Sequence, residues 1–255
     1  MGILDGRKAI VIGASSGVGY GIALRFAEEG ADVVAGARRV EKLEALAAEA
    51  KERGFAGEII PVACDVEQES HLDNILKVCI EKYGRVDILA CIAQGGLNDQ
   101  RSFFDTDMEN LLLFYKGGPG YTLQMVQKCL PYMKEQHYGR IITCASGAGL
   151  NYTKGTCAYG MAKAAIINLT KTCAHEMGQF GITTNCFLPV IINDHFLSGT
   201  NAAPPMEMMK QVIPVGFFGE AYKDGSPLVA FLASEGAGYI NGQVISICGG
   251  LVNPV

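Results

Sequence analysis

The sequence lacks the features that mark a membrane-spanning or nucleic-acid-binding protein. No apolar run approaches the ~20 residues that a membrane-spanning helix needs. The 21 lysines and arginines are outnumbered by 26 aspartates and glutamates, so the formal net charge is −5. No basic run departs from that balance. We therefore expect neither a nucleic acid nor a membrane as a partner.

Paired cysteines and metal-binding spacings are missing as well. The nine cysteines are an odd number without a C-x-x-C pair, and the four histidines show no H-x-x-x-H spacing. Several cysteines lie within apolar runs, namely Cys64, Cys91, Cys144 and Cys186. This pattern predicts buried thiols in a reducing cytoplasm rather than disulfides, and it predicts no metal site.

Two kinds of apolar segment alternate along the 255 residues, and no linker-like stretch divides them. We expect one domain over 1–255. Strands are predicted at 8–12, 32–36, 58–63, 86–92, 139–145, 182–188 and 244–247. Helices are predicted at 20–29, 41–53, 71–83, 105–136, 156–179 and 222–234. Strands joined by helices predict a parallel sheet with right-handed crossovers and helices on both faces.

A glycine-rich turn follows the first predicted strand and opens the first predicted helix. The turn reads Gly13-Ala14-Ser15-Ser16-Gly17-Val18-Gly19, with glycines spaced G-x-x-x-G-x-G. Such a turn lets the backbone approach a pyrophosphate laid on a helix N-terminus. It could also be merely structural, but its place at the first strand–helix junction favours dinucleotide binding. The predicted contacts are Gly13, Ser15, Ser16, Gly17, Val18 and Gly19.

Tyr159 and Lys163 lie four residues apart in a predicted helix, so both side chains project from one face. A fixed ammonium beside a phenol favours the phenolate and makes proton exchange easier. Ser146 follows a predicted strand, at the sheet edge where open α/β folds hold ligands. The alternative is a core tyrosine beside a solvated lysine.

Taken together, the glycine turn, Ser146 and Tyr159-x-x-x-Lys163 resemble the classical short-chain dehydrogenase/reductase family. The resemblance covers nearly the whole chain. It implies a Rossmann-like, doubly wound, mostly seven-stranded sheet, a homodimer or homotetramer, and hydride exchange between a nicotinamide cofactor and an alcohol or ketone. In that scheme Ser146 polarises a carbonyl, Tyr159 moves the proton, and Lys163 assists Tyr159 and holds the nicotinamide ribose.

The same resemblance implies further cofactor contacts. Asp65 and Val66 would lie by the adenine, where the Asp65 carboxylate would accept from the amino group. The remaining contacts, around the nicotinamide, are Ala93, Ile192 and Asp194.

The end of the second predicted strand favours NADP over NAD. NAD-selective relatives have an acidic residue there, whereas this chain has Ala37, followed by Arg38 and Arg39. Two guanidinium groups suit a 2′-phosphate. The alternative is that both arginines are solvated at a helix start, where cations oppose the helix dipole.

Several positions depart from the family. The usual Asn-Asn-Ala-Gly reads Cys91-Ile92-Ala93-Gln94, the usual Pro-Gly reads Pro189-Val190, and the catalytic Asn position falls on Gly118. A proline and three glycines within 116–120 predict a break or sharp kink in the long helix. We expect the Gly118 carbonyl to face a water near Lys163 in place of the Asn. The alternative is that the proton relay is lost.

The segment 191–218 is the expected substrate lid, although it could instead pack against the domain or a neighbouring subunit. Its methionines and phenylalanines predict a bulky, mostly apolar ketone or alcohol of alicyclic, steroid-like or aromatic type. Two alternatives remain open. One is a 3-oxoacyl-thioester reductase, and the other is a repurposed relative, either a cofactor-retaining isomerase or lyase or a nucleotide-sensing protein.

Overall fold

A computed structural model describes residues 2–152, 154–191 and 211–252, and one seven-stranded sheet lies at its centre. The sheet order is β3-β2-β1-β4-β5-β6-β7, and every pair of neighbours is parallel. The chain winds outward from β1 to β3 and then from β4 to β7, so the predicted doubly wound, Rossmann-like fold is confirmed. The strands are Lys8–Ile12, Asp32–Ala37, Ile59–Ala63, Ile88–Cys91, Gly139–Cys144, Ile182–Pro189 and Val244–Ile247.

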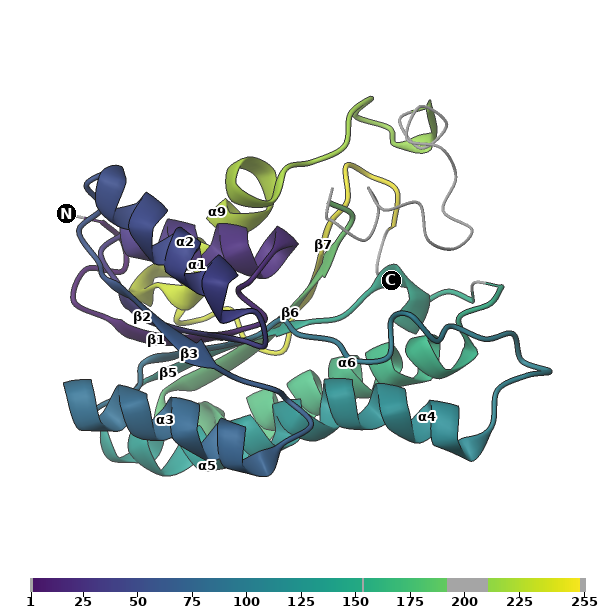
Figure 1. The fold of residues 1–255 in the computed structure, drawn as a ribbon, viewed down its shortest axis with the longest axis horizontal. Helices are drawn as coiled ribbons and strands as arrows, with labels where there is room; N and C mark the ends of the chain where they lie inside the picture. Colours follow the sequence, from purple (N-terminus) through teal and green to yellow (C-terminus); the bar gives the residue numbers. More distant parts are fainter. Residues whose placement is uncertain (1, 153, 192–210, 253–255) are drawn as a thin grey trace.

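Helices cover both faces of the sheet, as the alternating pattern predicts (Figure 1). One face carries α1 (Gly17–Glu28), α2 (Val40–Glu52) and α9 (Ser226–Ala233). The other face carries α3 (Glu69–Tyr83), α4 (Met108–Tyr115), α5 (Tyr121–Glu135) and α6 (Cys157–Met177). Each layer buries its own apolar core against the sheet, which explains why the central strands are apolar on both sides.

The predicted long helix is interrupted where its proline and glycines lie. Between α4 and α5 the residues Lys116–Gly120 form a π-helical turn, η1. The Tyr121 N–H donates to the carbonyl of Lys116, five residues back, so the i→i−4 ladder is broken there as predicted. Residues on both sides of η1 keep right-handed helical dihedrals, so the predicted break is a change of hydrogen-bond pattern rather than an end of the helix. The wider turn accommodates Pro119, which has no N–H to donate.

All nine cysteines are free thiols, and eight of them are buried, which confirms the expected burial of Cys64, Cys91, Cys144 and Cys186. Burial raises the pKa of the Cys64 and Cys144 thiols to about 11, so both are protonated at neutral pH. Over the described ranges of the chain, no helix combines the length and apolarity required to cross a bilayer.

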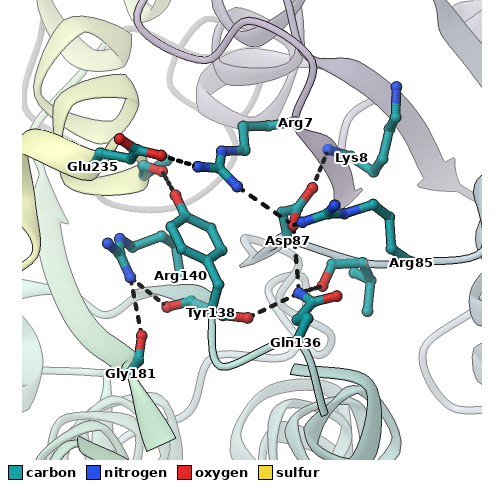
Figure 2. A network of polar contacts seen from close by, with 12 residues as sticks. Arg7, Lys8, Arg85, Asp87, Gln136, Tyr138, Arg140, Gly181 and Glu235 are labelled. Atoms are coloured by element: carbon teal, nitrogen blue, oxygen red, sulfur yellow. Dashed lines mark hydrogen bonds and ion pairs between the residues drawn. The ribbon is translucent and has the colours of Figure 1, made fainter. Parts of the chain in front are cut away.

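The amino ends of the strands are tied together by a polar network around Asp87 (Figure 2). Asp87 immediately precedes β4, and its side chain is 0% exposed. Its carboxylate accepts from the Lys8 N–H at 2.9 Å and from Arg85 Nη2 at 2.6 Å, and it lies 3.8 Å from Arg7 Nη1. Arg7 also pairs with the exposed Glu235. The network therefore joins β1, β4 and the segment after α9 on the side of the sheet away from the strands' carboxyl ends.

Asp87→Asn keeps the shape of the side chain but removes the charge that faces the two arginines. We expect the free energy of unfolding to fall by about 2–4 kcal/mol, because the fully buried carboxylate loses its charge-assisted hydrogen bond to Arg85 and its ion pair with Arg7. Glu235→Gln is the matched control, since Glu235 is 77% exposed. It should cost less than ~1 kcal/mol. Urea unfolding measures both changes, and equal losses would show that burial of Asp87 does not set the strength of the network.

Candidate functional site

The candidate site lies at the carboxyl ends of the central strands, opposite the Asp87 network. Here the chain leaves β1 at Gly13, β2 at Arg38, β3 at Cys64, β4 at Ile92 and β5 at Ala145. In a doubly wound sheet the two halves diverge between β1 and β4, which opens a crevice at this edge. Every predicted site residue within the described ranges lies on one of these strand ends or on the helix that follows.

The glycine turn is shaped for close backbone approach. Gly13 has φ of +97°, and a Cβ on it would lie 2.7 Å from the Ala93 backbone nitrogen at the end of β4. A side chain at either Gly13 or Gly19 would therefore separate elements that pack backbone to backbone. The α1 N-terminus carries no acidic residue in its first turn and no side-chain cap from Ser16. Its N–H groups fit an anionic phosphate.

The Arg39 side chain bonds to this turn, whereas the Arg38 side chain does not. Arg39 Nη2 donates to Ser15 Oγ at 3.0 Å and to Ser16 Oγ at 2.8 Å. Both arginines are exposed, and Ala37 ends β2 without a carboxylate. A guanidinium and two hydroxyls thus form one donor cluster beside the α1 N-terminus, which fits the 2′-phosphate of NADP. These contacts favour a ligand-binding role for Arg39 over the interpretation that both arginines are merely solvated.

Asp65 is held by a residue that the sequence analysis did not identify. Its backbone N–H donates to His71 Nδ1 at 3.1 Å, and its Oδ1 accepts from the Glu67 N–H at 3.1 Å. His71 lies in the first turn of α3, six residues along the chain. The imidazole therefore fixes the backbone of the predicted adenine contact, with Val66 half-buried beside it. No spacing in the sequence predicts this hydrogen bond, because it depends on where the first turn of α3 places the His71 side chain.

Lys163 is buried beside Tyr159, one turn along α6. Lys163 is 3% exposed, and its Nζ donates to the Cys144 carbonyl of β5 at 2.8 Å. The same Nζ lies 5.7 Å from the centroid of the Tyr159 ring. The alternative of a core tyrosine beside a solvated lysine is therefore wrong, because the buried member is the lysine and Tyr159 is half-buried.

Ser146 follows β5 and caps a short 3-10 turn, Gly147–Gly149. Its Oγ accepts from the Ala148 N–H at 3.2 Å, and its own hydrogen has no acceptor among the described residues. The turn packs against α6 without room for side chains, since a Cβ on Gly149 would lie 2.7 Å from the Lys163 carbonyl carbon. This packing brings the Ser146 strand end against the helix that carries Tyr159 and Lys163. Together they can donate a hydrogen bond to a carbonyl oxygen and transfer a proton to it.

The expected role of the Gly118 carbonyl is wrong. That carbonyl accepts from the Tyr121 N–H and from Thr122 Oγ1 at 2.9 Å, so both lone pairs are already engaged. The π-helical turn does lie beside the site, because Phe114, two residues before it, packs edge-on against Tyr159 with ring centroids 6.0 Å apart. Ile192, Asp194 and most of the expected lid lie outside the described residues.

Comparisons with known proteins agree with this geometry. A family model described as enoyl-(acyl carrier protein) reductase matches residues 13–252. A 3-oxoacyl-[acyl-carrier-protein] reductase of Thermotoga maritima is 33% identical over 255 residues, covering 98% of this chain and 99% of the relative.

Two solved structures have the same fold. A 7α-hydroxysteroid dehydrogenase complexed with NADH and 7-oxo glycochenodeoxycholic acid has a TM-score of 0.89 at 30% identity, covering 98% of this chain and 96% of that one. YwfH, an NADPH-dependent reductase involved in bacilysin biosynthesis, has a TM-score of 0.90 at 26% identity, covering 98% and 99% of the two chains.

His71→Leu removes the acceptor that holds Asp65 in place. We expect the affinity for NADPH to fall about tenfold, while the affinity for its hypoxanthine analogue, which lacks the adenine amino group, falls less than threefold. Titration of intrinsic nicotinamide fluorescence measures both constants. Asp73→Asn, an exposed change on the same helix that disturbs only a pairing with Lys128, is the control. Parallel losses for the two dinucleotides would mean that His71 does not act through the adenine contact.

Proposed function

Because the chain belongs to the short-chain dehydrogenase/reductase family, we propose that it is an NADP(H)-dependent enzyme that interconverts a secondary alcohol and a ketone. Membership itself establishes an oxidoreductase that uses a nicotinamide cofactor. The observation that carries the finer proposal is the buried Lys163 ammonium beside the Tyr159 ring, packed against the strand end that bears Ser146.

Each of these residues has a distinct task in the proposed reaction. NADP(H), when bound, supplies or accepts the hydride at the carbonyl carbon. Ser146 donates its free hydroxyl hydrogen to the carbonyl oxygen, and Tyr159 delivers the proton that completes the alcohol. The Tyr159 phenol oxygen has no hydrogen-bond partner among the described residues, so it is available to the substrate. Lys163 places its ammonium beside the Tyr159 ring and keeps two ammonium hydrogens for the nicotinamide ribose.

The preference for NADP rests on the donor cluster of Arg39, Ser15 and Ser16. A phosphate accepts charge-assisted hydrogen bonds from such a cluster, whereas the 2′-hydroxyl of NAD offers the guanidinium no opposite charge. Gly13, Gly17, Val18 and Gly19 would hold the pyrophosphate, and Ala93 would lie against the cofactor from the end of β4. Ile192 and Asp194 remain proposed contacts of the nicotinamide.

The proposed substrate is a bulky, mostly apolar alicyclic, steroid-like or aromatic ketone. The proposed lid, 191–218, contains one basic residue, Lys210, among many apolar ones. In its described part Ile213 and Phe218 are buried, while Val215 and Phe217 are exposed apolar groups that could cover a substrate. The hydroxysteroid dehydrogenase relative, whose structure holds an oxo bile acid, supports the same class.

Two other functions are each supported by one observation. The 33% identity to a 3-oxoacyl-[acyl-carrier-protein] reductase favours a 3-oxoacyl-thioester reductase, although the proposed lid offers little positive charge for an acidic carrier protein. The replaced Asn position favours a repurposed isomerase, lyase or nucleotide-sensing protein. Ketone-dependent loss of NADPH absorbance across a panel of ketones and oxoacyl thioesters separates the three.

The proposed assembly is a homodimer or homotetramer, and the proposed location is the cytoplasm. A stripe of exposed apolar side chains runs along α4 and α5 and supports a homodimer or homotetramer, since such stripes are normally covered. Its members are Met108, Leu112, Tyr115 and Leu123. The nine unpaired thiols support a reducing, cytoplasmic location, and we treat residues 1–255 as one domain.

Arg39→Ala should weaken NADPH binding about 10- to 100-fold and leave NADH binding within threefold, because only NADPH carries the 2′-phosphate. Arg38→Ala is the matched control and should change NADPH binding less, since Arg38 does not contact the serines. Dissociation constants from fluorescence titration provide the comparison. Equal losses for NADPH and NADH in the Arg38→Ala/Arg39→Ala double variant would mean that neither arginine recognises the phosphate.

Tyr159→Phe should lower kcat for ketone reduction at least a thousandfold and leave the NADPH dissociation constant within threefold, because only the proton-transfer group is lost. The variant should keep its melting temperature, since the Tyr159 hydroxyl makes no hydrogen bond with the described residues. Stopped-flow reduction of the best ketone in the panel measures the rate. Activity within tenfold of the wild-type enzyme would rule out Tyr159 as the proton donor.

A further inference from the structure

The side chain of Gln94, after the end of β4, reaches the interrupted helix beside the π-helical turn. Its Nε2 donates to the Phe114 carbonyl at 3.1 Å. The same Nε2 also donates to the Gly95 carbonyl at 2.9 Å. Gln94 therefore ties the strand end to the backbone of α4.

The Gln94 amide occupies the space that a side chain at position 118 would fill. A Cβ built on Gly118 would lie 2.7 Å from Gln94 Oε1 and 3.1 Å from Nε2. The amide reaches this space from the strand end, so a side chain added on the helix at position 118 would have to displace it.

The backbone on either side of Gln94 is held by hydrogen bonds to the helices. The Gly95 N–H donates to the Gly117 carbonyl at 2.8 Å, and Tyr121 Oη donates to the Ala93 carbonyl at 2.9 Å. Gln94 Oε1 is buried without a hydrogen-bond partner among the described residues. The strand end and the interrupted helix are therefore joined here through both main chain and side chain.

Phe114 connects this amide to the candidate catalytic residues. It is fully buried, and its ring packs edge-on against Tyr159. We propose that Gln94 and Gly118 form one positioning unit, in which the Gln94 amide holds the Phe114 backbone and thereby fixes the ring that supports Tyr159. The inference rests on the proposed function only in taking Tyr159 as the proton donor. Gln94 is a positioning residue and does not itself exchange a proton.

Gln94→Met tests the positioning role, because methionine keeps the length of the side chain but donates no hydrogen bond. We expect kcat for ketone reduction to fall at least tenfold, with KM and the NADPH dissociation constant within threefold, since misplacing a reacting group affects the chemical step. Gln124→Met is the control, because Gln124 also has a buried Oε1 without a partner but lies on α5. A Gln94→Met enzyme with the kcat of the wild-type enzyme would overturn the positioning role.

A double-mutant cycle tests whether the two residues form one unit. Gly118→Asn alone should lower both melting temperature and kcat, because its side chain overlaps the Gln94 amide. Gln94→Gly alone should lower both by removing the hydrogen bond from the side chain to the Phe114 carbonyl. The Gln94→Gly/Gly118→Asn double variant should have at least ten times the kcat of Gly118→Asn and a higher melting temperature.

The double-mutant cycle distinguishes a failure of this proposal from a failure of the proposed function. Losses of melting temperature that simply add would overturn the pairing, whatever the activity. If the wild-type enzyme reduces no ketone, the proposed function fails, and the melting-temperature cycle still decides whether Gln94 and Gly118 act together. A wild-type enzyme that reduces ketones, combined with coupled losses in both readouts, supports both proposals.

Discussion

A buried ammonium group without a carboxylate partner among the described residues constrains the whole site. Lys163 is almost fully enclosed, and its one hydrogen bond within the described residues is to the Cys144 carbonyl at the end of β5. A buried charge is costly unless polar groups replace its water, so α6 must stay in register with the sheet edge. The glycines at 149 and 160 allow that close packing, since a Cβ on either would meet backbone atoms across the junction. The positions of Tyr159 and Ser146 follow from this one contact.

The amino and carboxyl ends of the strands form two edges of the sheet that have different roles. At the amino ends, the buried Asp87 carboxylate is paired with Arg7 and Arg85, which ties strands together away from the candidate site (Figure 2). At the carboxyl ends, glycines and short polar residues replace bulky side chains, and the Ser146 and Tyr159 hydroxyls have no acceptor among the described residues. Rigidity is concentrated at one edge and available polar groups at the other, with the apolar strands between them. This separation lets the second edge keep unpaired donors, because stability is supplied elsewhere.

The sequence predicted the strands closely, because period, β-branched content and glycine turns are local signals. Lys8–Ile12 and Val244–Ile247 have the predicted bounds, and most other strands differ by one or two residues. The interruption near Pro119 was also predictable, since the missing N–H is a property of the residue itself. The direction of the Gly118 carbonyl was not, because it depends on the i→i−5 pattern and on the Thr122 hydroxyl. The roles of His71 and Gln94 were not predicted for a similar reason, because their hydrogen-bond partners are set by tertiary packing.

The close contact between positions 94 and 118 limits which residues either position can accept. A Cβ at position 118 would lie 2.7 Å from Gln94 Oε1, so a larger residue there requires the amide to move. A smaller residue at 94 removes that overlap and also removes the hydrogen bond to the Phe114 carbonyl. The two positions therefore tolerate change together more readily than one at a time.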